Sequence, residues 1–176
     1  MNILMKDTSI ALWHDVVKNA EDNCSIVLKE NLEAYLVALL VRYTTRPDIA
    51  KQILASAFLE ALNMRENQRN ASLQLVGDQC LIFAGFFPRL AEKRHVKLNY
   101  FVDLGKSAYG TISREADDLY WSLAVQFVGL MDILQSIRQT PDLLPLEAYE
   151  QWDAVGSQRA LRILRQYTGA TPLKKV

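Results

Sequence analysis

Apolar residues recur every three or four positions along most of the chain, which is the spacing of one face of an α-helix. Similar spacing predicts helices over 9–23, 29–43, 49–62, 70–84, 100–111, 113–139, 146–155 and 157–167. No stretch shows the strict alternation of apolar and polar residues that is typical of a half-buried strand. The pattern therefore predicts an all-α fold, and we expect an orthogonal bundle of seven or eight helices.

The segment 119–137 carries the most continuous apolar pattern, with Leu119, Leu123, Phe127, Leu130, Leu134 and Ile137 on one side. Because its other sides hold further apolar residues, we expect a helix that is covered all round and lies at the centre of the bundle. Ser113 is the predicted N-cap of this long helix, since acidic residues follow it in the first turn. The region 77–110 is then expected to wrap its side.

Residues with capping or breaking chemistry predict where other helices begin and end. Ser9 and Asn99 are suitable N-caps. Pro88 disfavours helical angles at the residue before it, so the sequence GFFP at 85–88 predicts a corner. Asp78 after Gly77 is ambiguous, because it could cap a new helix, or both residues could lie inside one continuous helix.

The composition is that of an ordinary folded domain. Of the 176 residues, 50% are hydrophobic and 23% charged, and a scarcity of breakers, 7 Gly and 5 Pro, favours helices over many short strands. We expect one helical domain over residues 1–176.

The balance of charge and the apolar runs limit the possible partners. The formal net charge is zero, so the whole molecule exerts no long-range attraction on nucleic acid or anionic lipid. No apolar run reaches the roughly 18 residues that a membrane-spanning helix needs, and acidic residues near the N-terminus interrupt any secretory hydrophobic region. These features predict a cytoplasmic protein without a membrane role.

Motifs of catalysis and of metal or cofactor binding are missing from the sequence. The chain has no GxSxG, Walker or GxGxxG motif, and its two histidines lack a partner at metal-ligand spacing. Cys24 and Cys80 stand far apart, which favours buried thiols over a disulfide framework. We therefore predict no catalytic residue, metal or cofactor.

Two glycines and an alanine, Gly105, Ala108 and Gly110, fall within one predicted helix. Small residues let another backbone or a ligand approach closely. We favour a crossing helix over a ligand as the reason for them.

Polar residues around the predicted corner form the one candidate ligand site. If the corner folds its flanking segments together, an acid, a base and an anion-binding arginine could converge. The residues of this site are Asp78, Arg94, His95, Tyr100, Asp103 and Tyr109. The competing interpretation is structural, with Asp78 as a cap, Asp103 paired with Arg94 or Arg89, and the tyrosines as packing.

The strings WHDVV, LEAYLVALLVRY, GDQCLIFAGFFP and YFVDLGKSAYG span much of the chain. Together they resemble a family of uncharacterised bacterial proteins. The resemblance implies a small helical domain and implies no activity.

These observations lead to three functional hypotheses. The first is a non-enzymatic interaction or regulatory module that contacts itself, as a homodimer, or a protein partner through Phe86, Phe87 and Tyr109. The second is a small-ligand-binding protein or enzyme with a pocket near 94–109. The third is nucleic-acid binding through Arg159, Arg162 and Arg165, which the neutral total charge disfavours.

Overall fold

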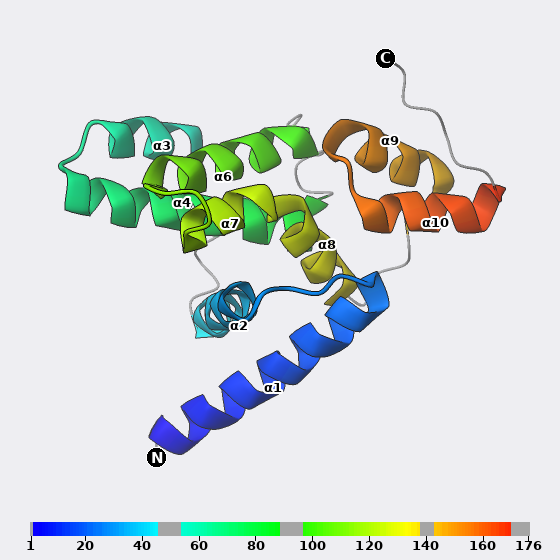
Figure 1. Cartoon of the computed structure of the whole chain (residues 1–176), viewed down its shortest axis with the longest axis horizontal. Helices are drawn as coiled ribbons and strands as arrows, with labels where there is room; N and C mark the ends of the chain where they lie inside the picture. The colour runs from blue at the N-terminus through cyan, green and yellow to red at the C-terminus, as the bar shows by residue number, and fades with distance from the viewer. Residues whose placement is uncertain (1, 46–53, 89–96, 138–142, 170–176) are drawn as a thin grey trace.

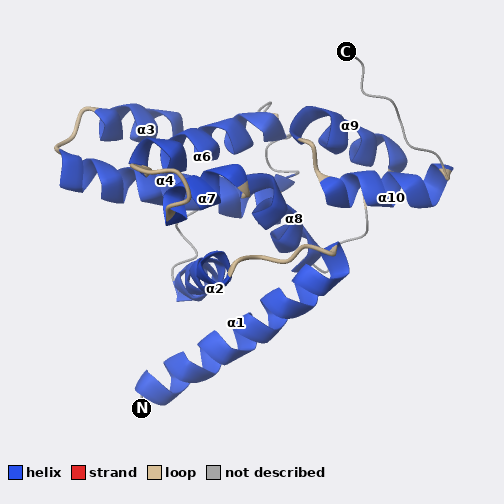
Figure 2. Ribbon diagram, viewed as in Figure 1, coloured by secondary structure: helices blue, strands red, loops and turns tan. Residues whose placement is uncertain are grey.

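The computed structural model describes residues 2–45, 54–88, 97–137 and 143–169. Every regular element in these ranges is a helix, which confirms the all-α prediction (Figure 2). Nine helices occur there, where the sequence predicted seven or eight. They are α1 (Asn2–Cys24), α2 (Glu30–Thr45), α3 (Leu54–Leu62), α4 (Glu66–Phe86), α6 (Leu98–Ile112), α7 (Leu119–Val125), α8 (Phe127–Ile137), α9 (Pro145–Val155) and α10 (Gln158–Thr168). The orthogonal arrangement stays a prediction.

Helix α4 is buried over its second half, and α8, within the segment 119–137 that we expected to be central, has no exposed residue. Every residue from 76 to 85 is buried, and α4 packs against α3, α6 and α8 (Figure 1). Its apolar residues enter the main hydrophobic core together with residues of α1, α2, α6, α7 and α8. The helix continues through Gly77 and Asp78 without a break, so of the two alternatives the continuous helix is confirmed and the cap at Asp78 is wrong. Burial of the surrounding turns offsets the helix cost of glycine, which is about 1 kcal/mol.

The prediction of one long helix after Ser113 is also wrong. Residues 113–118 form turns, with Asp117 in the left-handed region at φ 70°, and Asp118 is the N-cap of α7. The Asp118 carboxylate accepts a 2.7 Å hydrogen bond from the backbone N–H of Trp121. A second interruption at Gln126 separates α7 from α8. The apolar pattern continues across both helices because both face the same core, and for this reason periodicity alone did not reveal the break.

Two other helix starts differ from those predicted. Helix α1 begins at Asn2, so Ser9 lies within it, and α6 begins at Leu98, so Asn99 is its second residue. The predicted corner is confirmed, since α4 ends at Phe86 and Phe87 leaves the helical region. Positions 49–53 of the third predicted helix lie outside the described residues.

The glycine at position 105 confirms the prediction that a crossing helix requires small residues. A Cβ atom there would lie 2.4 Å from the Phe127 ring of α8 and 3.0 Å from Cβ of Cys80 in α4. Ala108 is fully buried in the same face of α6. Gly110 differs, because a Cβ atom there would meet nothing within 4 Å. The close helix approach therefore depends on Gly105 and Ala108.

Helices α9 and α10 pack side by side at one end of the molecule (Figure 1). Gly156, in the left-handed region at φ 74°, ends α9, and Ser157 is the N-cap of α10. The buried apolar residues of this pair form a hydrophobic cluster separate from the main core. We call α9 and α10 the C-terminal hairpin.

Candidate functional site

Asp78 is the centre of the largest polar network of the main core. It lies in the fourth turn of α4 with 2% of its surface exposed. A buried carboxylate is costly unless hydrogen-bond donors surround it. The surrounding helices supply such donors, so the geometry of Asp78 depends on tertiary packing.

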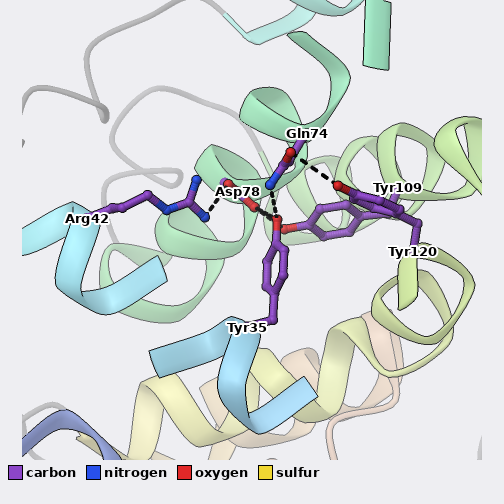
Figure 3. Close-up of polar contacts among 6 residues, drawn as sticks. All are labelled: Tyr35, Arg42, Gln74, Asp78, Tyr109 and Tyr120. Carbon is purple, nitrogen blue, oxygen red and sulfur yellow. Dashed lines mark hydrogen bonds and ion pairs between the residues drawn. The ribbon is translucent and has the colours of Figure 1, made fainter. Parts of the chain in front are cut away.

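Three side chains donate to the Asp78 carboxylate (Figure 3). The hydroxyl of Tyr35 in α2 and that of Tyr109 in α6 donate to Oδ1 at 2.5 Å and 2.7 Å. The guanidinium of Arg42, which lies two turns after Tyr35 on the same side of α2, donates to Oδ2 at 3.1 Å. One buried carboxylate thereby links three helices, α2, α4 and α6.

A second layer extends the network to α7. Gln74, one turn before Asp78 on α4, donates from Nε2 to the Tyr35 oxygen at 3.1 Å. Its Oε1 accepts a 3.2 Å bond from the hydroxyl of Tyr120 in α7. The amide of Gln74 thus fixes both tyrosines relative to α4, as Figure 3 shows.

Gly77 makes room for the Tyr109 ring. A Cβ atom at position 77 would lie 2.6 Å from Cε1 of that ring. Tyr109 is fully buried and also packs on Phe127 and edge-on against Tyr35. Glycine at 77 therefore lets the phenol lie against α4 and reach the Asp78 carboxylate.

Burial controls the protonation of this network. It raises the pKa of Asp78, and the two tyrosine hydroxyls and Arg42 oppose that rise because they stabilise the carboxylate. Burial and the neighbouring carboxylate raise the pKa of Tyr35 and of Tyr109 well above the ordinary range. Both phenols are consequently donors at neutral pH.

The Asp78 carboxylate forms its hydrogen bonds within the chain. Both Asp78 oxygens are occupied by internal donors. A cleft of about 450 Å³ lies between the start of α6 and α9, and its lining includes Lys97, Tyr149 and Glu150 but no residue of the network. Asp78 therefore links α4 directly to α2 and α6, and Gln74 extends the network to α7.

Of the other predicted ligand-site residues, the two that the structure describes do not join Asp78 and Tyr109. Tyr100 and Asp103 are exposed on α6, and Arg94 and His95 lie outside the described residues. Tyr35 and Arg42 were missed because their helix was interpreted by its apolar face alone. Their seven-residue spacing places them on one side of α2, which is the signal that could have identified them.

The predicted interaction residues are mostly engaged within the chain. Phe86 and Phe87 are half-buried, with the Phe86 ring stacked on Tyr43 at 5.9 Å. Tyr109 is fully buried and cannot contribute to an exposed groove, whereas contact with a partner through Phe86 and Phe87 stays a prediction.

The predicted arginine stripe on α10 is also partly engaged. Arg159 donates to Gln135 of α8, and Arg162 donates to the backbone oxygens of Asn23 and Cys24 at the end of α1. Arg165 is exposed. Two of the three cations thus help to hold helices together.

A smaller hollow of about 160 Å³ lies where the loop between α1 and α2 meets α7. Its lining is mainly apolar and includes Leu28, Leu32, Trp121 and Val125. Val27, at its rim, has 93% of its surface exposed. We call Val27, Trp121 and Val125 the loop patch.

Within the described ranges, no three His, Cys, Asp or Glu side chains are placed to hold a metal ion, and none of the helices there has the length and hydropathy to cross a membrane. The family models, the curated proteins and the solved structures yield no match to this chain. The resemblance to a bacterial family therefore stays a prediction, and functional inference rests on the geometry of the chain itself.

Proposed function

We propose that this protein is a non-enzymatic helical interaction module that forms a homodimer through the loop patch. The observation that carries the proposal is the exposure of Val27, at 93%, beside a hollow with apolar walls. When a partner covers an apolar side chain that protrudes this far into water, burial of its surface stabilises the complex.

The shape of the loop patch favours a second copy of the chain as the partner. A two-fold dimer brings the same surface of both copies together, so that surface must be complementary to itself. The loop patch has a protruding valine directly beside an apolar hollow, and a two-fold axis at its edge would place each Val27 in the other copy's hollow. Val125 and Trp121, with 53% and 37% exposed, would be covered in the same contact.

The charge of the surface is compatible with this arrangement. Lys29 is the charged residue among those that line the hollow. One cation at the rim can remain in water on its flexible chain while the apolar centre is buried. Interfaces of this kind have an apolar centre surrounded by polar groups.

Sedimentation velocity over a wide range of protein concentration tests the proposal. We expect the native chain to shift from monomer to dimer and Val27→Asp to stay monomeric. The matched control is Ser107→Asp, which places the same charge at an exposed position on α6 and should dimerise like the native chain. A native chain that is monomeric throughout, or a Val27→Asp variant that dimerises equally well, would refute the proposal.

The alternatives receive less support from the described residues. A ligand site built on Asp78 and Tyr109 would have to displace their internal hydrogen bonds. Nucleic-acid binding would have to rely mainly on Arg165 among the three predicted arginines. The proposal retains the cytoplasmic, bacterial setting predicted from the sequence, which localisation of the tagged protein in its host tests.

A further inference from the structure

The loop that carries Val27 is bound on both sides of this residue by Glu21, which lies in the last turn of α1 and is 3% exposed. The backbone oxygen of Glu21 accepts a 3.0 Å hydrogen bond from the N–H of Ile26. Its side-chain Oε1 accepts a 2.7 Å bond from the N–H of Leu28. One buried residue therefore holds the backbone before and after the exposed valine.

The burial of the three loop residues follows from this arrangement. Ile26 packs against the main core and Leu28 is 6% exposed, whereas Val27 between them is 93% exposed. Such alternation is typical of a segment whose successive side chains point to opposite sides. The two bonds to Glu21 keep this segment against α1 and so keep Val27 on its outer side.

The buried carboxylate of Glu21 has a cation beside it. A carboxylate removed from water is costly unless a charge or hydrogen-bond donors compensate it. Lys18, one turn earlier on α1, places its Nζ 3.5 Å from Oε2 of Glu21 and 2.5 Å from Oε2 of Glu33 in α2. Glu21 precedes the loop and Glu33 follows it, so one ammonium group links the two helices that the loop connects.

Contacts with other elements fix the beginning of the loop. Arg162 of α10 donates to the backbone oxygens of Asn23 and Cys24. Ile26 lies beside α8, where a Cβ atom at Gly129 would be 4.0 Å from its Cδ1. These contacts precede Val27 in the chain, whereas the Glu21 carboxylate binds the residue after it. Loss of the carboxylate bond would therefore free the N–H that follows Val27 and leave the start of the loop in place.

We propose that Glu21 is a positioning residue for the loop patch, whose carboxylate holds the backbone at Leu28 and thereby presents Val27 to the second copy. This inference rests on the dimer proposed above and adds the residue that prepares its surface. A loop that is ordered before contact favours association, because binding no longer has to order it. Both copies of a two-fold dimer must present an ordered loop, so any loss of order acts twice. If the ordered loop falls to about a tenth of the molecules, the dissociation constant rises about a hundredfold.

Two conservative substitutions separate the position of the acceptor from its charge. Glu21→Asp keeps the charge but withdraws the carboxylate from the Leu28 N–H by one methylene group. Glu21→Gln keeps an oxygen at the native length and loses the charge. Hydrogen exchange of the Leu28 amide, measured by NMR in the Val27→Asp background to remove the effect of dimerisation, reports the state of the loop. We expect exchange about tenfold faster with Glu21→Asp and close to the unsubstituted rate with Glu21→Gln.

Sedimentation velocity of the same two substitutions, with Val27 present, measures their effect on the dimer. We expect Glu21→Asp to raise the dissociation constant about a hundredfold and Glu21→Gln to dimerise nearly as well as the native chain. Asp78→Asn is the control for stability, because its side chain bonds to α2 and α6 and not to the loop. It should dimerise like the native chain.

Leu28 exchange that Glu21→Asp leaves unchanged, or that Glu21→Gln accelerates more than Glu21→Asp does, overturns the inference. Equal dimerisation of Glu21→Asp and the native chain overturns it as well. If Glu21→Asp does not fold, the Leu28 amide of Glu21→Gln decides the question, because loss of its protection would show that the acceptor does not hold the loop. A native chain that stays monomeric refutes the dimer instead, and exchange of the Leu28 amide then still tests the part of Glu21 in the loop.

Discussion

The hydroxyl of Tyr109 donates a 2.7 Å hydrogen bond to the Asp78 carboxylate, and both side chains are buried. The two residues lie 31 positions apart on α4 and α6, whose contact is the most extensive between any two described helices. The bond therefore fixes the rotation of α6 relative to α4. Because Arg42 and Tyr35 bind the same carboxylate, the position of α2 is fixed by the same group.

Removal of the Asp78 charge should destabilise the fold. In Asp78→Asn the amide N–H₂ would face donors that now point at an oxygen, so we expect the free energy of unfolding to fall by about 1 to 3 kcal/mol. Urea denaturation followed by circular dichroism measures the change. Asp103→Asn is the matched control, since Asp103 is exposed on α6 and should lose no more than about 0.5 kcal/mol. Equal effects of the two substitutions would contradict the structural role of the network.

The two glycines of α6 should respond in opposite directions to alanine. Gly105→Ala places a methyl group against Phe127 and Cys80, and overpacking of this kind costs about 1 to 3 kcal/mol. Gly110→Ala places it in open space, where the better helix propensity of alanine should stabilise the protein by up to about 1 kcal/mol. Thermal unfolding of both variants checks the prediction. A stabilising Gly105→Ala would mean that α6 and α8 are farther apart than described.

The cap of α7 should depend on the acceptor at position 118. The Asp118 carboxylate accepts from the backbone N–H of Trp121 and of Arg114, and these bonds lower its pKa to about 2. The stabilisation is therefore present above about pH 4 and lost as the pH falls toward 2. We expect Asp118→Ala to lower the melting temperature at pH 7 and Asp118→Asn, which keeps an acceptor, to lower it less. A larger loss in the asparagine variant would contradict the capping role.

Arg162 should stabilise the end of α1, whereas Arg165 should not. The Arg162 guanidinium donates to the backbone oxygens of Asn23 and Cys24, which are free of intrahelical partners at a helix C-terminus. Arg162→Ala should therefore cost about 1 kcal/mol and increase hydrogen exchange in the last turn of α1. Arg165→Ala removes an exposed cation of the same helix and should leave both quantities unchanged. Similar effects of the two variants would show that the bond to α1 carries no stability.

The local pattern of the sequence determined the class of fold and several helix boundaries. Apolar spacing specified helices because period and secondary structure are linked through backbone geometry. The corner before Pro88 also followed from local chemistry, since a proline restricts the residue before it. Gly105 was recognised as a packing position because glycine within a helix needs a reason beyond propensity.

Only the tertiary structure decided what the polar residues do. Asp78 was judged as a cap because its local sequence permits one, but its partners come from α2 and α6, tens of residues away. The break at Gln126 was hidden because apolar residues on both sides face the same core. The exposure of Val27 and the burial of Asp132 depend equally on which helices lie nearby. Periodicity reports how a residue is placed on its own helix, whereas burial and hydrogen-bond partners depend on the packing of the others.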